Sequence, residues 1–362
     1  MALQVFTPLQ QKSLLPCVAG EKLKGKLGKG NIMPNIKLSL AACDYDHLRD
    51  LFTGRVKVEG VDIIPMVFDE PHHIFHRASN FTEFDIHEMS FGRYISLVSQ
   101  KKNEMTALPV FPSRVARQSA FYVRSGSRIK NTLDLEGKRV GIPEWTQTAT
   151  IYARGWLAET EGVDLRKIQW FQTGVDQPGR SEPSNPVLPP GINVTPVPDK
   201  SLSELILSGD IDCALTALPP KPFREGDRRV KRLVRNARRV EENYYRETGI
   251  FPIMHLICVK NEVLEKYPWV AMNLFEAFED AKNNAIDRAL KGSHSIYPFP
   301  WAADSAELVR DMFEGDMWPY GLEPNRRTIE AFLRFGFEQG VAHLNLKPEV
   351  LFAPQTLNIA KT

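Results

Sequence analysis

"LDLEGKRVGIPEWTQTATIY", residues 133–152, passes from one backbone pattern to another within a few positions. After a polar turn, residues 138–142 predict a short strand that ends before Pro143. Thr146 and Thr148 then lead into a stretch that predicts a helix over residues 146–160. A strand that runs directly into a helix is the repeating unit of α/β proteins, so this stretch indicates the fold class.

The same alternation continues on both sides of this stretch. Ile36, Leu38 and Leu40 recur at a period of two, which predicts a strand near the start of the folded chain. Residues 250–260 predict another strand, and residues 268–290 predict a long helix that has a proline in its first turn. Strands therefore alternate with helices along most of the sequence, which places the protein in the α/β class.

The bulk composition is that of a globular protein large enough for two lobes. The chain has 362 residues, of which 43% are hydrophobic and 25% are charged. Its formal net charge is +2, so no overall field favours nucleic acid or a membrane surface. No stretch reaches the roughly 18 apolar residues of a membrane-spanning helix. We therefore expect neither a nucleic-acid nor a membrane partner, and the sequence leaves homo-oligomer formation open.

Two local features have a plain structural interpretation. Residues 224–249 are densely basic, but Glu and Asp flank the run, which favours a solvated face over a nucleic-acid site. The four cysteines form no CxxC pair, and Cys43 and Cys258 lie within apolar runs. We expect these two to be buried free thiols.

Residues 1–32 do not have the pattern of a secretory signal. Such a signal has a basic region followed by an apolar core. Here Gln and Pro interrupt the apolar part, and the lysines follow it. We interpret residues 1–32 as a disordered leader, expect the folded chain to start at Met33, and expect the protein to be cytoplasmic.

Several side chains are candidates for holding an anion. Thr146 and Thr148 lie at the start of the predicted helix, where free N–H groups can bind a carboxylate or phosphate. Alternatively, the two residues only cap the helix. Arg114 lies where the chain is predicted to cross between two lobes. It could bind a carboxylate through two hydrogen bonds or form a structural ion pair. Arg93 follows a predicted strand and faces either a ligand or solvent.

Histidines offer acid–base chemistry, and one pair offers metal binding. His255 lies in an apolar strand, where a histidine is either a core residue or a site residue with a pKa suited to proton transfer. His72 and His76 share a helix face, but no matching acidic or cysteine ligand follows, so we expect no metal site. The sequence has no GxGxxG, phosphate-loop or GxSxG motif, which leaves nucleotide cofactors and serine hydrolysis without support.

Six sequence segments, taken in order, resemble one protein family. They are "DYDHLRDLFTGRVKVEGVD", "FDIHEMSFGRY", "PVFPSRVARQS", "GKRVGIPEWTQTATIYARGWL", "TGIFPIMH" and "WPYGLEPNRRTIEAFL". Together they look like the 4,5-dihydroxyphthalate decarboxylase family over about residues 36–340. That family resembles the solute-binding proteins of ABC transporters in fold.

The resemblance implies a two-lobed, type 2 periplasmic-binding-protein-like fold with a ligand cleft between the lobes. Residues 33–118 would form the first part of lobe 1, and residues 119–243 would form lobe 2. Residues 244–362 would return to lobe 1 and add C-terminal helices. Residues 176–200 contain seven prolines and would form a long irregular loop of lobe 2.

The resemblance also implies an activity: the carboxy-lyase conversion of 4,5-dihydroxyphthalate to protocatechuate and CO2, with no cofactor. On this hypothesis His255 donates a proton to the ring, and Asp44 or Glu88 takes the phenolic proton. The residues expected to bind the aromatic dicarboxylate are Arg114, Arg93, Ser90, Trp145, Thr146 and Thr148. The alternative is the solute-binding protein of an ABC transporter for an aromatic carboxylate.

Overall fold

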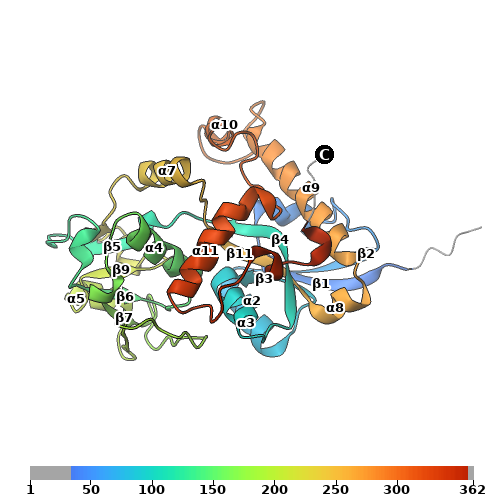
Figure 1. Cartoon of the computed structure of the whole chain (residues 1–362). Helices are drawn as coiled ribbons and strands as arrows, with labels where there is room; N and C mark the ends of the chain where they lie inside the picture. Colours follow the sequence, from blue (N-terminus) through green and yellow to red (C-terminus); the bar gives the residue numbers. More distant parts are fainter. Residues whose placement is uncertain (1–33, 358–362) are drawn as a thin grey trace, which may run out of the picture. The chain divides into compact units, whose positions relative to one another are not determined.

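The protein is built on two β-sheets with helices packed around them (Figure 1). The structure, a computed structural model, describes residues 34–357. Its first sheet has the strand order β2-β1-β3-β11-β4, and its second has the order β10-β5-β9-β6-β7-β8. The predicted α/β class is confirmed. The expected leader at residues 1–32 lies outside the described residues.

The first sheet is mainly parallel at one side and antiparallel at the other. β1 pairs in parallel with β2 and β3, and β11 is antiparallel to both β3 and β4. Its strands are β1 (Ile36–Cys43), β2 (Val61–Phe68), β3 (Ile86–Ser90), β4 (Met105–Arg114) and β11 (Ile253–Lys260).

The second sheet uses the intervening part of the chain. Its strands are β5 (Phe121–Arg124), β6 (Arg139–Ile142), β7 (Gln169–Gln172), β8 (Val194–Pro196), β9 (Cys213–Leu215) and β10 (Val230–Arg232). The chain thus leaves the first sheet after β4 and returns to it with β11. We call the two sheets with their helices lobe 1 and lobe 2; the predicted boundaries at 118/119 and 243/244 stay predictions.

The helices vary from single turns to a long helix across lobe 1. They are α1 (Arg49–Phe52), α2 (Pro71–Phe81), α3 (Phe91–Ser99), α4 (Thr148–Glu159), α5 (Leu202–Ser208), α6 (Lys221–Arg224), α7 (Ala237–Thr248), α8 (Asn261–Lys266), α9 (Val270–Leu290), α10 (Ala302–Met312) and α11 (Arg326–Glu338). Short 3-10 turns connect several of them, among them η1 (Asp46–Leu48) and η2 (Gln118–Ala120).

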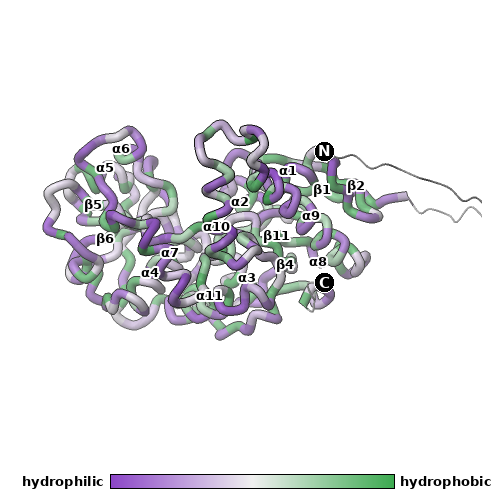
Figure 2. The backbone as a smooth tube through the Cα atoms, turned by 90° about the horizontal axis from the view of Figure 1, so that it is seen from above, coloured by the Kyte–Doolittle hydropathy of each residue, from purple (hydrophilic) through white to green (hydrophobic). Residues whose placement is uncertain are grey.

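Proline placement explains which strands lie at the edges of the first sheet. Proline has no backbone N–H to donate, so it is tolerated in an edge strand and not in a central one. Pro65 lies in β2, and Pro109 and Pro112 lie in β4, the two edge strands. β11 lies between two strands and is buried along most of its length, which matches its run of hydrophobic residues in Figure 2.

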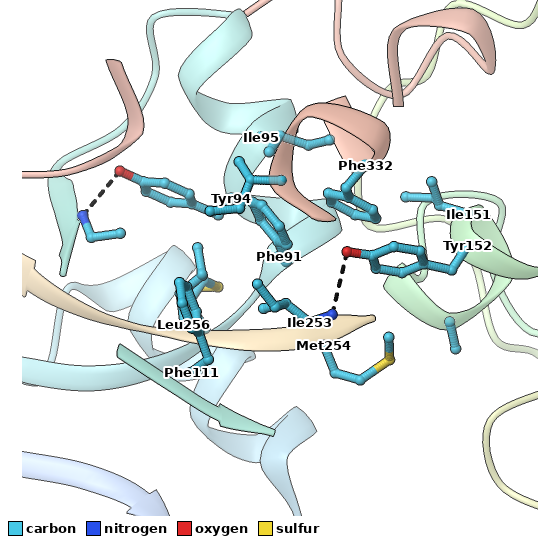
Figure 3. Packing of buried hydrophobic residues seen from close by; sticks show 14 of the residues in the cluster. Phe91, Tyr94, Ile95, Phe111, Ile151, Tyr152, Ile253, Met254, Leu256 and Phe332 are labelled. Atoms are coloured by element: carbon cyan, nitrogen blue, oxygen red, sulfur yellow. Dashed lines mark hydrogen bonds between the residues drawn. The ribbon is translucent and has the colours of Figure 1, made fainter. Parts of the chain in front are cut away.

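Helix α4 follows a strand of lobe 2 yet packs into the core of lobe 1. Tyr152 of α4 accepts a hydrogen bond from the backbone N–H of Ile253 at 3.3 Å. Its ring stacks on Phe332 at 4.6 Å, and Phe332 stacks on Phe91 of α3 at 4.2 Å (Figure 3). Each fully buried aromatic side chain stabilises the fold by about 1.5–3 kcal/mol. This aromatic stack therefore anchors the start of β11 and the first turns of α3 and α4 together.

The remaining sequence-based expectations concern cysteines, membranes and the proline-rich loop. Cys43 and Cys258 are buried free thiols as predicted, and so is Cys213. None of the helices within residues 34–357 is long and apolar enough to cross a membrane. Residues 176–200 are irregular apart from β8, as predicted.

Candidate active site

His255 and Glu88 form a close pair at the centre of the first sheet. The Nδ1 atom of His255 lies 2.5 Å from Oε1 of Glu88. The Glu88 side chain is fully buried, whereas the His255 side chain is 16% exposed. Burial raises the pKa of Glu88, but the charge and hydrogen bond of His255 and further hydrogen bonds outweigh it and leave the pKa below its ordinary value. An ionised carboxylate only accepts hydrogen bonds, so Nδ1 carries a proton and donates a hydrogen bond to Glu88.

Two further groups hold the Glu88 carboxylate in place. The hydroxyl of Tyr45 donates to Oε1 at 2.6 Å, and the backbone N–H of Cys43 donates to Oε2 at 3.0 Å. Burial and the neighbouring Glu88 charge raise the pKa of Tyr45, so its hydroxyl stays protonated. Phe75 contacts the His255 ring edge to face, with 5.0 Å between the ring centres. Nε2 of His255 has no hydrogen-bond partner among the described residues and is left available to a ligand.

The parallel strands explain why these residues meet. β1 and β3 run in the same direction, so their carboxyl ends lie at one edge of the sheet, where ligands of α/β proteins usually bind. Tyr45 follows β1, while Glu88 and Ser90 belong to the end of β3. Ser90 is directly opposite His255 in the antiparallel pair of β3 and β11. Opposite residues share a face of the sheet, so Ser90 and His255 project from the same face.

The start of α4 from lobe 2 meets the start of α3 at this same edge. Ser90 is the N-cap of α3, and its hydroxyl lies 3.0 Å from the hydroxyl of Thr148. The backbone N–H of Gly92 also donates to Thr148 Oγ1 at 2.9 Å. A Cβ atom at Gly92 would lie 2.4 Å from the carbonyl oxygen of Thr146, so only glycine allows this approach. Ser90 and Thr148, two predicted site residues, are thus brought together.

Arg93 lies one turn further along α3. Its Nε donates to the hydroxyl of Ser79 at 2.8 Å, and its two terminal nitrogens have no hydrogen bond to any residue within 34–357. Burial lowers the pKa of Arg93, and the charges of Glu144 and Glu182 from lobe 2 oppose this. A half-buried guanidinium with free terminal nitrogens is a suitable ligand for a carboxylate.

Sequence comparison identifies the family of a chain with this site. The chain is 34% identical over 330 residues to the 4,5-dihydroxyphthalate decarboxylase of Comamonas testosteroni, which covers 91% of this chain and 100% of that protein. The chain belongs to the 4,5-dihydroxyphthalate decarboxylase family. The resemblance that rests on the six sequence segments is confirmed. No family profile matches the chain.

Solved structures show the fold that this member of the decarboxylase family shares with other proteins. The periplasmic aliphatic sulphonate-binding protein SsuA of Escherichia coli matches with a TM-score of 0.51 at 11% identity, over 89% of this chain and 98% of that chain. The desulfurization enzyme DszB matches with a TM-score of 0.50 at 14% identity, over 90% and 98% of the two chains. The predicted two-lobed, binding-protein-like fold is confirmed. Since a binding protein and an enzyme both have it, the fold alone does not decide function.

Arg114, a predicted substrate ligand, forms hydrogen bonds within its own chain. Its terminal nitrogens donate to the carbonyls of Pro319 at 3.2 Å and Phe251 at 2.8 Å and to the side chain of Asn325 at 2.8 Å. The side chain is buried, and burial lowers its pKa to about 10. This placement argues against the predicted contact with a substrate carboxylate, because the guanidinium already joins three segments of lobe 1.

Trp145, predicted to stack on a substrate ring, is a buried core residue. Only 1% of it is exposed, and its indole N–H donates to the carbonyl of Gln339 at 2.8 Å. The guanidinium of Arg154 covers its ring at 3.7 Å, and Trp170 contacts it edge to face. The predicted stacking on the substrate is therefore not supported, since protein side chains already occupy the ring.

Thr146 already binds a carboxylate, and that carboxylate belongs to the protein. Glu182 accepts hydrogen bonds from the backbone N–H of Trp145 at 2.7 Å and of Thr146 at 3.2 Å, and from the Thr146 hydroxyl. Burial raises the pKa of Glu182, and these hydrogen bonds oppose it. In this structure the anion at this turn is the carboxylate of Glu182, from the proline-rich loop. Binding of a substrate carboxylate there stays a prediction.

Asp44 has no hydrogen bond or ion pair with the His255–Glu88 pair among the described residues. It follows the last residue of β1, its side chain is exposed, and it has no hydrogen bond or ion pair within the described part of the chain. No group of three or more metal-ligating side chains occurs among residues 34–357.

Sequence reasoning missed Tyr45, Phe75 and Glu182. Tyr45 lies two residues past the end of a parallel strand, a position that could have marked it as a site residue. Phe75 belongs to the apolar face of α2, where nothing in the pattern distinguishes it from a core residue. Glu182 lies in an irregular loop with no periodicity, so no local signal points to it.

Proposed function

We propose that this protein removes CO2 from a hydroxylated aromatic dicarboxylate without oxidation, and that 4,5-dihydroxyphthalate is the substrate and protocatechuate the product. The observation that supports this most directly is the contact of His255 Nδ1 with the buried Glu88 carboxylate. A buried carboxylate that orients an imidazole and stabilises its protonated form is a common arrangement for proton transfer. The name of the Comamonas testosteroni relative supports the choice of substrate.

The reaction needs one proton delivered to a ring carbon. When the hydroxyl para to the departing carboxylate loses its proton, its electron pair is pushed into the ring, and the carbon that bears the carboxylate accepts a proton. The bond from that carbon to the carboxylate then breaks, CO2 leaves, and the electron pair restores the aromatic ring. The substrate's own phenol accepts and returns the electrons, so no cofactor is proposed.

His255 is the proposed proton donor to the ring carbon. Nδ1 is bound to Glu88, so Nε2 is the nitrogen that would hold and release the proton. Glu88 is fully buried and saturated by His255, Tyr45 and Cys43, so we no longer propose it as the base for the phenol. Its role would be to orient His255 and to stabilise the imidazolium form.

Asp44 is the proposed acceptor of the phenolic proton. It is exposed at the carboxyl end of β1, one residue after the Cys43 N–H that binds Glu88, and it has no partner among the described residues. Its carboxylate could therefore meet a phenol that enters beside His255.

Arg93 and Ser90 are proposed to hold the carboxylate that the product retains. Arg93 has two free donors in the fork geometry that matches a carboxylate. Ser90 lies opposite His255 in the sheet, which would place the retained carboxylate next to the one that departs. Thr148 would support the Ser90 hydroxyl through their hydrogen bond.

We place the reaction in the cytoplasm, because the three buried free thiols within residues 34–357 suit a reducing compartment.

The test is to incubate the purified protein with 4,5-dihydroxyphthalate and to measure protocatechuate and CO2. We expect both in equal amounts from the natural protein and a loss of turnover in His255→Asn. Binding of the compound without any product would instead support a receptor for an aromatic carboxylate, the alternative that the sulphonate-binding fold keeps open.

A further inference from the structure

An arginine-lined groove runs along α7, on a different part of the surface from the candidate active site. It has a volume of about 880 Å³, and one carboxylate, that of Glu242, lies among its guanidinium groups. Its arginines are Arg232, Arg235, Arg238, Arg239 and Arg246. Figure 2 shows the hydrophilic character of this helix. Glu242 pairs with Arg238 at 2.8 Å and with Arg246 at 3.5 Å. Arg235 and Arg239 have no ion-pair partner among the described residues, so the groove has a surplus of positive charge.

Helix α10 presents the complementary surface. Trp301, its N-cap, is 75% exposed, and Leu308 is 64% exposed. With Asp304 and Asp311 these residues recur at i, i+3, i+7 and i+10, so they lie on one face of the helix. No residue of α10 is buried, and Asp304 and Glu307 form no ion pair within residues 34–357. A helix that exposes a tryptophan and a leucine beside the unpaired carboxylates of Asp304 and Glu307 has the character of an interaction surface.

α7 and α10 are neighbours in the same chain. The ring of Tyr245 on α7 stacks on Phe313, just after α10, with 4.3 Å between the centres, and Phe251 contacts both. Among the described residues, however, no ion pair joins the arginines of α7 to the carboxylates of α10. The C-terminal ends of the two helices therefore meet, and their two surfaces have opposite charge that no described ion pair between them neutralises.

We propose that the α7–α10 face is the surface through which two copies of this chain associate. A twofold axis between the two helices would place α10 of each copy in the arginine groove of the other, so both contacts form at once and the assembly closes as a dimer. Trp301 and Leu308 would supply the apolar centre of the interface. The unpaired charges would set its orientation and make association sensitive to salt.

The first test measures mass by sedimentation velocity over a wide range of protein concentration, at low and high salt. We expect a dimer that dissociates more readily at high salt. Leu308→Asp should weaken the dimer by roughly thirtyfold or more, the loss that follows removal of a central apolar anchor. Leu133→Asp is the matched control, because Leu133 is 55% exposed in lobe 2, and it should leave the mass unchanged. Unchanged thermal unfolding of both variants would show that they are folded.

A charge exchange tests the pairing itself. The variant Arg235→Glu with Arg239→Glu and the variant Asp304→Arg with Glu307→Arg should each be monomeric, because like charges would meet at both contacts. Mixed in equal amounts, they should form a heterodimer, because opposite charges then meet at both contacts again. A natural protein that stays monomeric at every concentration would overturn the proposal. So would a dimer that Leu308→Asp does not weaken, or two charge variants that do not combine.

Discussion

The carboxylate of Glu182 lies in the anion site that begins at Thr146, held by the Thr146 backbone N–H at 3.2 Å and by its hydroxyl. The same carboxylate accepts from the Trp145 N–H. The proline-rich loop is also tied to lobe 1, where the N–H of Val187 donates to the carbonyl of Gly340. Glu182 therefore fastens an otherwise irregular loop to the turn from which α4 starts.

Replacing Glu182 tests how much this carboxylate stabilises the fold. Glu182→Ala would leave two backbone N–H groups and a hydroxyl without their acceptor, which costs about 1–3 kcal/mol. Glu182→Gln should cost less, because its amide oxygen can still accept one or two of these bonds. Urea unfolding of both variants measures the difference. Equal stability of Glu182→Ala and the natural protein would show that water replaces the carboxylate.

Replacing His255 and Glu88 separates the proposed donor from the residue that orients it. His255→Asn should lower kcat by roughly a hundredfold or more, the contribution of a general acid. Glu88→Gln keeps the shape of the side chain but not its charge, so we expect a smaller loss of kcat and a shifted pH profile. His294 lies in an exposed loop, and His294→Asn is the control. If His255→Asn retained most of the natural kcat, the proton donor would have to be another residue.

The sequence predicts the fold better than it predicts the contacts of the site. The strand β1 and the long helix α9 follow from apolar spacing, which is a local signal. The position of His255 opposite Ser90 depends on the pairing of strands that are 165 positions apart in the sequence. No local pattern contains that information, so the pairing could be inferred only through the family resemblance.

Three of the predicted substrate-binding residues have partners within the protein. Arg114, Trp145 and Thr146 have the right chemistry for an aromatic dicarboxylate, but each already contacts a partner within the protein. Those partners are the carbonyl of Phe251, the guanidinium of Arg154 and the carboxylate of Glu182. A side chain that can bind a ligand can equally bind its own chain, and only the folded structure distinguishes the two.

Arg114 and Arg93 should therefore respond differently to the same substitution. Arg114→Met removes donors from three buried acceptors, so we expect a loss of stability of about 3 kcal/mol or more. Arg93→Met removes one hydrogen bond to Ser79 and should leave stability nearly unchanged while it raises KM for the dicarboxylate. Urea unfolding and steady-state kinetics on both variants measure the two effects. A normal KM in Arg93→Met would exclude it as the carboxylate ligand.

His87 should make stability depend on pH in a defined window. It is fully buried beside the Glu88 backbone, and burial lowers its pKa from 6.5 to about 4. Between these values the unfolded chain binds a proton that the folded chain does not, so the free energy of unfolding falls as the pH falls. From pH 7 to pH 5 this single group should remove about 2 kcal/mol. Over the same pH range His87→Gln should therefore lose about 2 kcal/mol less than the natural protein. The loss that remains includes the part due to His47, whose pKa burial also lowers to about 4. Urea unfolding at both pH values gives the comparison. If the free energy of unfolding of His87→Gln depended on pH as it does in the natural protein, His87 would be protonated in the folded protein.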